Sequence, residues 1–267
     1  MKFVCFFILF VFTFVIHTPV YAQKIGPFTI KQKDYVDLNG DGQKEFIELF
    51  ARKSQYHEHE WKLVVDGKEV AVFDNKDKYI LAKMEFADLL HEGKQDILLY
   101  FHSGDSGGTT GLVVLKQDKK KLKQIFTDPI PKNIASYYET TKKRFSMKYL
   151  GNYQVEFIDK QTGLAAIIPL SKERYKDYPN QEIIQNLLGK ITTWVDPVSD
   201  YHFDEVTKNK PKEIVTIQRV SGIAHVDIIA RYETRYVFNN KIQKYVPAKV
   251  ALYSNETGKQ LAQKISK

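Results

Sequence analysis

The stretch "DLNGDGQKEFIELF", from Asp37 to Phe50, changes character half-way along its length. Its first half carries oxygen-bearing side chains at alternate positions, interrupted by Gly40 and Gly42. Glycine adopts a positive φ at no steric cost, so this half predicts a tight turn. The second half, "EFIELF", alternates between polar and apolar residues and predicts a strand. We expect the fold to be built from units in which such a turn feeds a strand.

Two later segments repeat the spacing of this unit. Asp37–Asp66, Asp88–Asp118 and Glu205–Asn239 each open on a carboxylate and carry a second one eight positions later. Each then enters an apolar strand, reaches a serine, crosses a polar or glycine-rich loop and begins a hairpin. The second carboxylates are Glu45, Asp96 and Glu213, and the serines are Ser54, Ser103 and Ser221. Any β protein places loop, strand and hairpin in series, but the shared offset favours degenerate repeats.

Hairpin signals dominate the rest of the chain. Pairs of apolar runs surround turn-forming residues at Asp66-Gly67, Asp118-Lys119, Lys160–Gly163 and Asn239-Asn240. Helical periodicity is confined to 171–178 and 180–194. We therefore predict a mostly-β protein with a short helical insertion at 171–194.

The acidic turn has the donor chemistry of a calcium site. Asp37, Asn39 and Asp41 place side-chain oxygens at alternate positions, and Glu45 supplies a late carboxylate. Ca²⁺ takes six to eight oxygen ligands in flexible geometry, whereas zinc usually recruits nitrogen or sulfur. The stretch also satisfies the EF-hand pattern, but its flanks alternate like strands and do not predict helices.

The loop resembles the calcium loops of FG-GAP and VCBS-type repeats, the blades of integrin-like β-propellers. "DLNGDGQKEF" matches that family's Asp-x-Asn-x-Asp-Gly-x-x-Asp pattern, with a glutamate in place of the final aspartate. The resemblance implies a bacterial secreted protein whose repeats form a β-propeller-like or open multi-sheet array. It also implies Ca²⁺ bound by the side chains of Asp37, Asn39, Asp41 and Glu45 and by the backbone carbonyl of Gln43.

The other two loops depart from this pattern. "DLLHEGKQD" keeps Asp88, Glu92 and Asp96 but has Leu90 at the second ligand position, which makes it a possible degenerate metal loop. "EVTKNKPKE" has Lys210 in place of the glycine, and we expect it to bind no metal. One complete, one degenerate and one lost site is the outcome expected if calcium only stabilises a turn.

The N-terminus reads as an export signal. Lys2 precedes the apolar run Phe3–Ile16, and Val20-Tyr21-Ala22 is a cleavage-like triplet. We predict a signal peptide at 1–22, an N-terminal repeat region at 23–130, and a C-terminal β region at 131–267 that holds the helical insertion and the third repeat. The only cysteine, Cys5, lies in the signal, so the mature chain would have no disulfide or thiolate site. These features predict a secreted or cell-envelope protein.

The charge pattern argues against a nucleic-acid partner. The formal net charge is +8, but basic and acidic residues are interspersed. The one dense basic run, 116–123, is predicted to be a hairpin turn. Partners at the envelope, either a protein or a polysaccharide, fit better, and no membrane span is expected after signal cleavage.

Two function classes remain open from the sequence. A non-catalytic binding or structural module is favoured, because no paired acid/base signature is present. The alternative is a secreted hydrolase that uses residues of the inter-strand loops. "GDSGG" around Ser106 is spelled like the serine-protease nucleophile motif, but too little chain precedes it for that fold. The loop residues that we expect to share one rim are His102, Asp105, His225 and Asp227.

Overall fold

The computed structural model describes residues 26–53, 58–74, 81–104, 107–118 and 121–265. Strands make up 56% of the chain and helices 11%, which confirms the mostly-β prediction. The strands of the described residues form four antiparallel sheets, none of which closes on itself. A propeller is therefore not shown, and the arrangement is an open multi-sheet array. None of the described helices is long and apolar enough to cross a membrane.

The N-terminal half consists of two four-stranded meanders. The first sheet contains β1 (Thr29–Val36), β2 (Glu45–Lys53), β3 (Glu58–Val65) and β4 (Lys68–Asp74). The second sheet contains β5 (Leu81–Ala87), β6 (Asp96–His102), β7 (Thr110–Asp118) and β8 (Lys121–Asp128). In both sheets the strands pair in sequence order, so every connection is a turn or short loop between neighbours.

The C-terminal half contains two further sheets and the helices. After α1 (Ile134–Arg144), the three-stranded sheet is formed by β9 (Phe145–Gly151), β10 (Gln154–Asp159) and β11 (Leu164–Pro169). The helical insertion follows, with the 3₁₀ turn η1 (Glu173–Tyr175) and α2 (Gln181–Gly189). The five-stranded sheet contains β12 (Val195–Asp204), β13 (Glu213–Ser221), β14 (Ile228–Asn239), β15 (Lys244–Ser254) and β16 (Gln260–Ile265).

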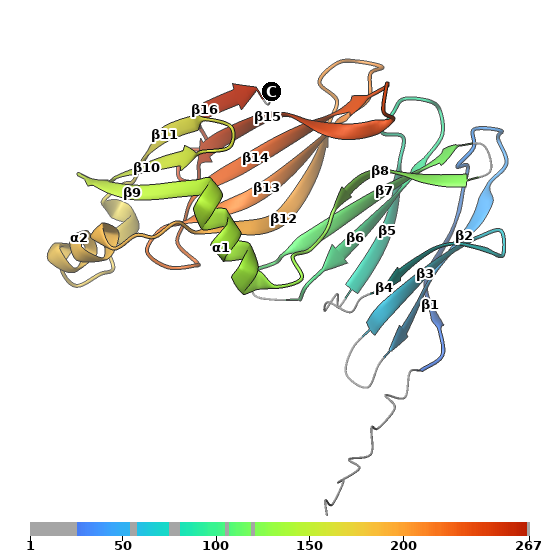
Figure 1. The fold of residues 1–267 in the computed structure, drawn as a ribbon, viewed down its shortest axis with the longest axis horizontal. Helices are drawn as coiled ribbons and strands as arrows, with labels where there is room; N and C mark the ends of the chain where they lie inside the picture. The colour runs from blue at the N-terminus through green and yellow to red at the C-terminus, as the bar shows by residue number, and fades with distance from the viewer. Residues whose placement is uncertain (1–25, 54–57, 75–80, 105–106, 119–120, 266–267) are drawn as a thin grey trace, which may run out of the picture.

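The sheets succeed one another along the molecule, from the first sheet at one end to the three-stranded sheet and α2 at the other (Figure 1). The strand "DILLYFH" of β6 explains how the second sheet fits between two neighbours. Ile97 and Leu99 face the first sheet and pack in its core, whereas Leu98 packs in a second core with residues of the five-stranded sheet. Side chains alternate across a strand, so a continuous apolar run is buried on both faces.

A third hydrophobic core joins the three-stranded sheet to the five-stranded sheet. Phe157 from β10 and Tyr232 from β14 are fully buried in it, with ring centroids 5.9 Å apart. Ile184 and Leu188 of α2 belong to the same core and lie one turn apart, as the helical periodicity predicts.

The local predictions from turn chemistry are confirmed. The strands on either side of each proposed hairpin pair antiparallel in the expected order. At the β3–β4 turn, Asp66 and Gly67 both have positive φ, of 48° and 72°. The Asp118-Lys119 turn is confirmed by its flanking strands, although Lys119 itself lies outside the described residues.

The helix α1 contradicts the prediction that helix is confined to 171–194. Its sequence, "IASYYETTKKR", has no apolar stripe, and Thr141 is its only buried residue. The helix is instead defined by its ends. The side chain of Asn133 caps the first turn by accepting from the backbone N–H of Ser136, and three basic residues occupy the last turn.

Candidate functional site

The acidic loop of the first sheet is folded around its own carboxylates. The Asp37 carboxylate accepts the backbone N–H groups of Gly40 at 2.6 Å and of Gly42 at 2.9 Å. Glu45 accepts the N–H of Leu38 at 2.7 Å. Desolvation raises the pKa of the Asp37 carboxyl, but its backbone hydrogen bonds together outweigh this effect, and the pKa lies below its ordinary value.

The remaining loop residues complete the same local network. The Asn39 side-chain amide donates to Glu45, and its carbonyl oxygen accepts the N–H of Asp41 at 2.8 Å. The Asp41 carboxylate in turn accepts the N–H of Gln43 at 2.8 Å. These are turns of the Asx type, in which a side chain satisfies the backbone two residues ahead.

The second loop reproduces this geometry at the same offsets. Asp88 accepts the N–H of Gly93 at 2.9 Å, as Asp37 does from Gly42. Asp96 accepts the N–H of Leu89 at 3.2 Å, as Glu45 does from Leu38. The equal spacing from Asp37 to Glu45 and from Asp88 to Asp96 therefore reflects the same turn in both sheets. This confirms the predicted correspondence of the first two segments.

The charged groups of the second loop differ from those of the first. Burial raises the pKa of the Asp96 carboxyl to about 7. Glu92 forms ion pairs with Lys94 at 3.1 Å and with Lys116 at 2.6 Å. A carboxyl group that is half-protonated near neutrality and one paired to two lysines are both poorer cation ligands than free carboxylates.

The third segment does not share this turn. Glu205 accepts only a long hydrogen bond from the N–H of Asn209, at 3.4 Å. Glu213 lies on β13 and pairs with Arg235 at 3.2 Å, so it plays no part in the loop. The third acid thus begins a strand, as Glu45 and Asp96 do, but the turn before it is built differently, and its assignment as a third, degenerate repeat stays a prediction.

The oxygen-only donor set of Asp37, Asn39, Asp41 and Glu45 fits the chemistry of calcium. In the part of the chain that the structure describes, however, no three Asp, Glu, His or Cys side chains converge in a group that could hold a metal ion. The loop carboxylates are directed at backbone N–H groups, so the turn is held by hydrogen bonds of its own. Calcium binding at this loop stays a prediction.

Of the four residues expected on a common rim, the structure describes His102, His225 and Asp227. Asp105 lies outside the described residues, as does Ser106. His102 ends β6, and burial, together with nearby Lys83, lowers the pKa of its imidazole. Asp227 pairs with Arg174. Within the described residues, no hydrogen bond or ion pair joins His102 to His225 or Asp227.

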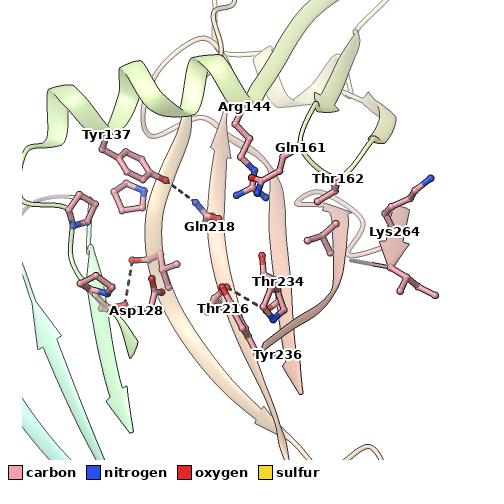
Figure 2. A pocket seen from close by; sticks show the side chains of 18 residues that line it. Asp128, Tyr137, Arg144, Gln161, Thr162, Thr216, Gln218, Thr234, Tyr236 and Lys264 are labelled. Atoms are coloured by element: carbon pink, nitrogen blue, oxygen red, sulfur yellow. Dashed lines mark hydrogen bonds between the residues drawn. The ribbon is translucent and has the colours of Figure 1, made fainter. Parts of the chain in front are cut away.

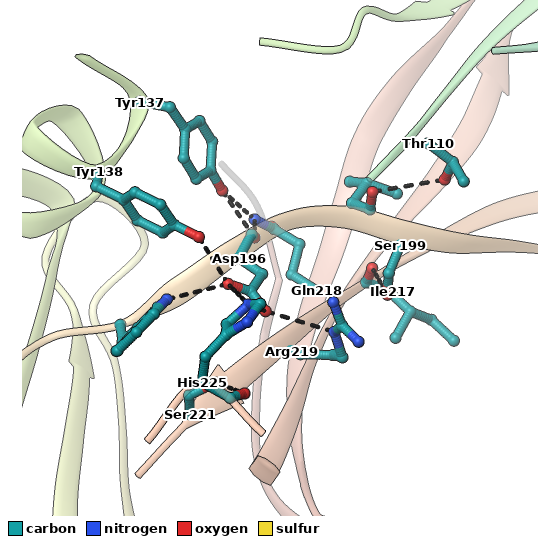
Figure 3. A network of polar contacts seen from close by, with 12 residues as sticks. Thr110, Tyr137, Tyr138, Asp196, Ser199, Ile217, Gln218, Arg219, Ser221 and His225 are labelled. Atoms are coloured by element: carbon teal, nitrogen blue, oxygen red, sulfur yellow. Dashed lines mark hydrogen bonds and ion pairs between the residues drawn. The ribbon is translucent and has the colours of Figure 1, made fainter. Parts of the chain in front are cut away.

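His225 belongs to a polar cluster centred on Asp196 (Figure 3). Nε2 of His225 lies 3.1 Å from both carboxylate oxygens of Asp196, which is 1% exposed. The Tyr138 hydroxyl and the Trp194 indole N–H donate to the same carboxylate, at 2.9 Å and 3.2 Å. The imidazole stacks on Trp194 with ring centroids 5.2 Å apart. Since Tyr138 lies on α1, the cluster fastens that helix to β12.

The space between α1 and the inner face of the five-stranded sheet is hollow (Figure 2). It is a cavity of about 490 Å³. Its floor carries Thr216 and Gln218 from β13 and Thr234 from β14, and the Tyr137 hydroxyl receives a hydrogen bond of 2.9 Å from the Gln218 amide. Prolines from three different segments form part of its wall, namely Pro129 and Pro131 after β8, Pro197 on β12 and Pro247 on β15.

Arg144, the last residue of α1, supplies a fixed cation at this cavity. Its Nε and Nη2 donate to the two oxygens of Asp159 at 3.1 Å and 3.0 Å, and Nη2 also donates to the Tyr232 hydroxyl at 2.9 Å. Burial of Asp159 raises its pKa, but the hydrogen bonds from Arg144 and Tyr232 outweigh this and hold the pKa below its ordinary value. Nη1 of Arg144 has no hydrogen-bond partner among the described residues.

Two further ionisable groups lie on the cavity wall. Asp128, at the end of β8, accepts a hydrogen bond of 2.8 Å from the Tyr201 hydroxyl. Burial raises the pKa of this carboxyl, and the hydrogen bond offsets only part of the effect. Lys264, on β16, is exposed at the edge of the cavity. The site therefore has cationic groups at one side and a carboxyl with a weakened acidity at the other.

The model of the YybI C-terminal domain matches residues 143–253. That segment begins at the end of α1 and includes the three-stranded sheet and most of the five-stranded sheet. The FG-GAP/VCBS assignment drawn from the acidic loop is therefore wrong, because the family model that matches is a different one. No curated protein matches.

Two solved structures align over most of this chain. The exotype rhamnogalacturonan lyase YesX has 10% identity and a TM-score of 0.30, over 88% of this chain and 55% of that one. The rhamnogalacturonan lyase YesW has 11% identity and a TM-score of 0.29, over 87% of this chain and 57% of that one. The chain thus spans little more than half the length of either lyase, and likeness at this level supports no inference about activity.

Sequence reasoning missed both the cavity and the Asp196 cluster. A usable signal is the run of polar residues at inward positions of β13 and β14. Thr216 pairs directly with Thr234, and Gln218 pairs with buried Tyr232. Polar side chains on the core-facing side of a strand are unusual, and they mark a place where a strand faces something other than a hydrophobic core.

Proposed function

We propose that the chain is a non-catalytic binding module whose ligand occupies the cavity between α1 and the five-stranded sheet. The observation that carries the proposal is the cavity itself. Its volume of about 490 Å³ lies within the roughly 300–1,000 Å³ that is usual for small-ligand sites. Its lining is mostly polar, with prolines and valines between the polar groups, and several of these groups are already fixed by other contacts.

Preorganisation supports binding at this place. Arg144 is held by Asp159 and Tyr232, so its free Nη1 donors can engage a ligand with little loss of side-chain freedom. Gln218 is likewise held, because its amide donates to Tyr137 and to the Asp196 carbonyl at 2.8 Å. Such groups contribute specificity at low entropic cost.

The lining also defines the class of ligand. Hydroxyl and amide groups of Thr216, Gln218 and Thr234 suit a ligand with several hydroxyls. Arg144 and Lys264 favour an acidic group, and Asp128 is the one carboxyl among the lining residues. We therefore propose a polyhydroxylated ligand with an acidic substituent, such as an acidic sugar at the end of a larger chain.

Three probes that share a ring and differ in charge test this class. Glucuronate, glucose and glucosamine would be titrated against the purified chain at millimolar concentrations by ligand-observed NMR and calorimetry. We expect glucuronate to bind most tightly and glucosamine least. Glucosamine binding as tightly as glucuronate, or no saturable binding by any of the three, would refute the proposal.

A matched pair of variants tests the position. Lys264→Gln removes the cation at the edge of the cavity, whereas Lys259→Gln removes an exposed cation from the turn before the same strand. We expect only the first to reduce the preference for glucuronate over glucose. Equal effects of the two substitutions would indicate long-range charge and not a contact in the cavity.

We further propose that the module acts outside the cytoplasm, at the cell envelope, and that calcium stabilises its first loop. The export signal at 1–22 supports the first point, and the oxygen donors of Asp37, Asn39, Asp41 and Glu45 support the second. The calcium would hold the turn between β1 and β2 and takes no part in binding at the cavity.

The hydrolase alternative rests on the contact of His225 with Asp196. An aspartate that orients a histidine is a common device of general-base catalysis. The nearest candidate nucleophile is engaged otherwise, because the buried Ser221 hydroxyl donates to the backbone carbonyl of His225 at 3.0 Å. Stoichiometric labelling of Ser106 by a fluorophosphonate probe would favour the hydrolase over the binding module.

A further inference from the structure

The outer face of the five-stranded sheet carries two arginines directly opposite each other. Arg219 on β13 pairs in register with Arg231 on β14. Their neighbours along the strands, Val220 and Ala230, belong to the hydrophobic core on the other face. Because side chains alternate across a strand, both guanidinium groups lie on the face away from that core.

Both arginines keep buried donors that have no hydrogen-bond partner. Nη2 of Arg219 and Nε of Arg231 are shielded from solvent and make no hydrogen bond to a described residue, and Nε of Arg219 makes an ion pair but no hydrogen bond. The one ion pair of Arg219 is with Asp196, at 3.4 Å from Nε. Arg231 makes no ion pair with any residue that the structure describes. A buried donor left unsatisfied is destabilising, so unfilled donors at such a place call for an acceptor.

The carboxylates of this face do not neutralise the pair. Glu233, the next residue of β14 on the same face, lies 3.9 Å from Arg235. Arg235 itself is paired with Asp204 at 2.7 Å and with Glu213 at 3.2 Å. The acidic groups therefore gather around Arg235. Like charges directly opposite each other on neighbouring strands are destabilising. In the pair of Arg219 and Arg231, the charge of Arg231 has no carboxylate partner among the described residues.

We propose that the outer face of the five-stranded sheet binds an oxyanion between Arg219 and Arg231. A phosphate, sulfate or carboxylate group presents several acceptor oxygens, and the planar guanidinium fork matches them with paired donors. One such group would accept from both arginines and offset their mutual repulsion. The site lies on the opposite face from the cavity and is independent of the ligand proposed there.

Thermal unfolding of the purified chain in different sodium salts tests this site. Phosphate, sulfate and acetate would each be compared with chloride at equal ionic strength. Phosphate and sulfate also stabilise proteins through exclusion from their surface, so the decisive quantity is the difference between wild type and a variant. Arg231→Met removes the donors and keeps an unbranched stem. Lys249→Met, on the same face and with the same loss of charge, is the control.

We expect the gain in Tm from phosphate over chloride to be larger in wild type and Lys249→Met than in Arg231→Met. Calorimetry should show phosphate affinity at least about tenfold weaker in Arg231→Met. In chloride, Arg231→Met should be as stable as wild type or more so, because the like-charge contact is gone. A specific gain with acetate as well would define a general carboxylate and phosphate site, and a gain with only phosphate and sulfate would define a tetrahedral one.

NMR gives a readout that does not depend on stability. The Nε–Hε resonances of Arg219 and Arg231 should shift on addition of phosphate, and that of Arg235 should not. Unmoved Arg219 and Arg231 resonances, or an equal phosphate gain in wild type and Arg231→Met, would overturn the proposal.

Discussion

Asp159 is the buried charge on which the position of Arg144 depends, and its removal should be costly. The carboxylate is fully buried and accepts from Arg144, from the Tyr232 hydroxyl at 2.6 Å and from the Thr162 hydroxyl at 2.7 Å. Asp159→Asn removes the charge and places an amide donor among these donors. Breaking a buried ion pair from one side costs roughly 3–5 kcal/mol.

The low end of that range applies here, because the side chain of Arg144 is 32% exposed and can be rehydrated. A loss of about 3 kcal/mol corresponds to a fall in Tm of roughly 6–12 °C for a chain of this size. Thermal unfolding followed by circular dichroism at pH 7 measures it. Asp177→Asn, at an exposed position in the helical insertion, is the matched control and should change Tm little.

The same substitution makes a prediction about pH. The folded pKa of Asp159 lies below its unfolded value of about 3.9, so its stabilisation is complete above the unfolded value. The stabilisation is lost as pH falls through the folded pKa. The Tm gap between wild type and Asp159→Asn should therefore narrow from pH 5 toward pH 3. Two results would refute the role given to this carboxylate. One is a difference in unfolding free energy between wild type and Asp159→Asn below about 1 kcal/mol at pH 7. The other is a Tm gap that does not narrow in acid.

Three further predictions concern the loop, the N-terminus and the cavity wall. Calcium at about 1 mM should bind the first loop and raise Tm by roughly 3–6 °C. Asp41→Ala should abolish this rise. A Tm that changes with neither chelator nor calcium would show that the loop is only a hydrogen-bonded turn. Mass spectrometry of an envelope fraction should find Gln23 as the mature N-terminus, and intact chains that begin at Met1 would contradict export. Gly111→Ala would bring a Cβ within 2.9 Å of the Asp128 carbonyl oxygen and should cost about 1–3 kcal/mol in denaturant unfolding, whereas unchanged stability would show that this part of the wall is loosely packed.

The sequence was sufficient for the features that depend on neighbouring residues. The hairpins follow from turn chemistry such as Asp66-Gly67, and α2 follows from apolar residues one turn apart. The repeated turn of the first two sheets was also visible, because Asp37 and Asp88 act on backbone groups only a few residues away. All of these interactions close within a short length of chain.

The features that were missed depend on distant contacts. α1 has no apolar stripe, and it is held by hydrogen bonds from Tyr137 and Tyr138 to a residue almost sixty positions later, Asp196. The spacing of Glu205 and Glu213 could not show that Glu213 forms an ion pair with Arg235, on a neighbouring strand. The cavity draws on eight separate segments, and no local pattern brings them together.

The burial of both faces of the second sheet has a consequence for dividing the chain. Residues 26–130 contain two complete meanders, yet this fragment would leave Leu98, Val114 and Phe126 without the five-stranded sheet that covers them. A fragment that ends there would expose a broad hydrophobic surface and should bind hydrophobic dyes and self-associate. Removal of the first sheet would uncover Ile97 and Leu99 on the opposite side with the same result. The second sheet thus belongs to the hydrophobic cores on both of its sides, and the chain is best expressed whole.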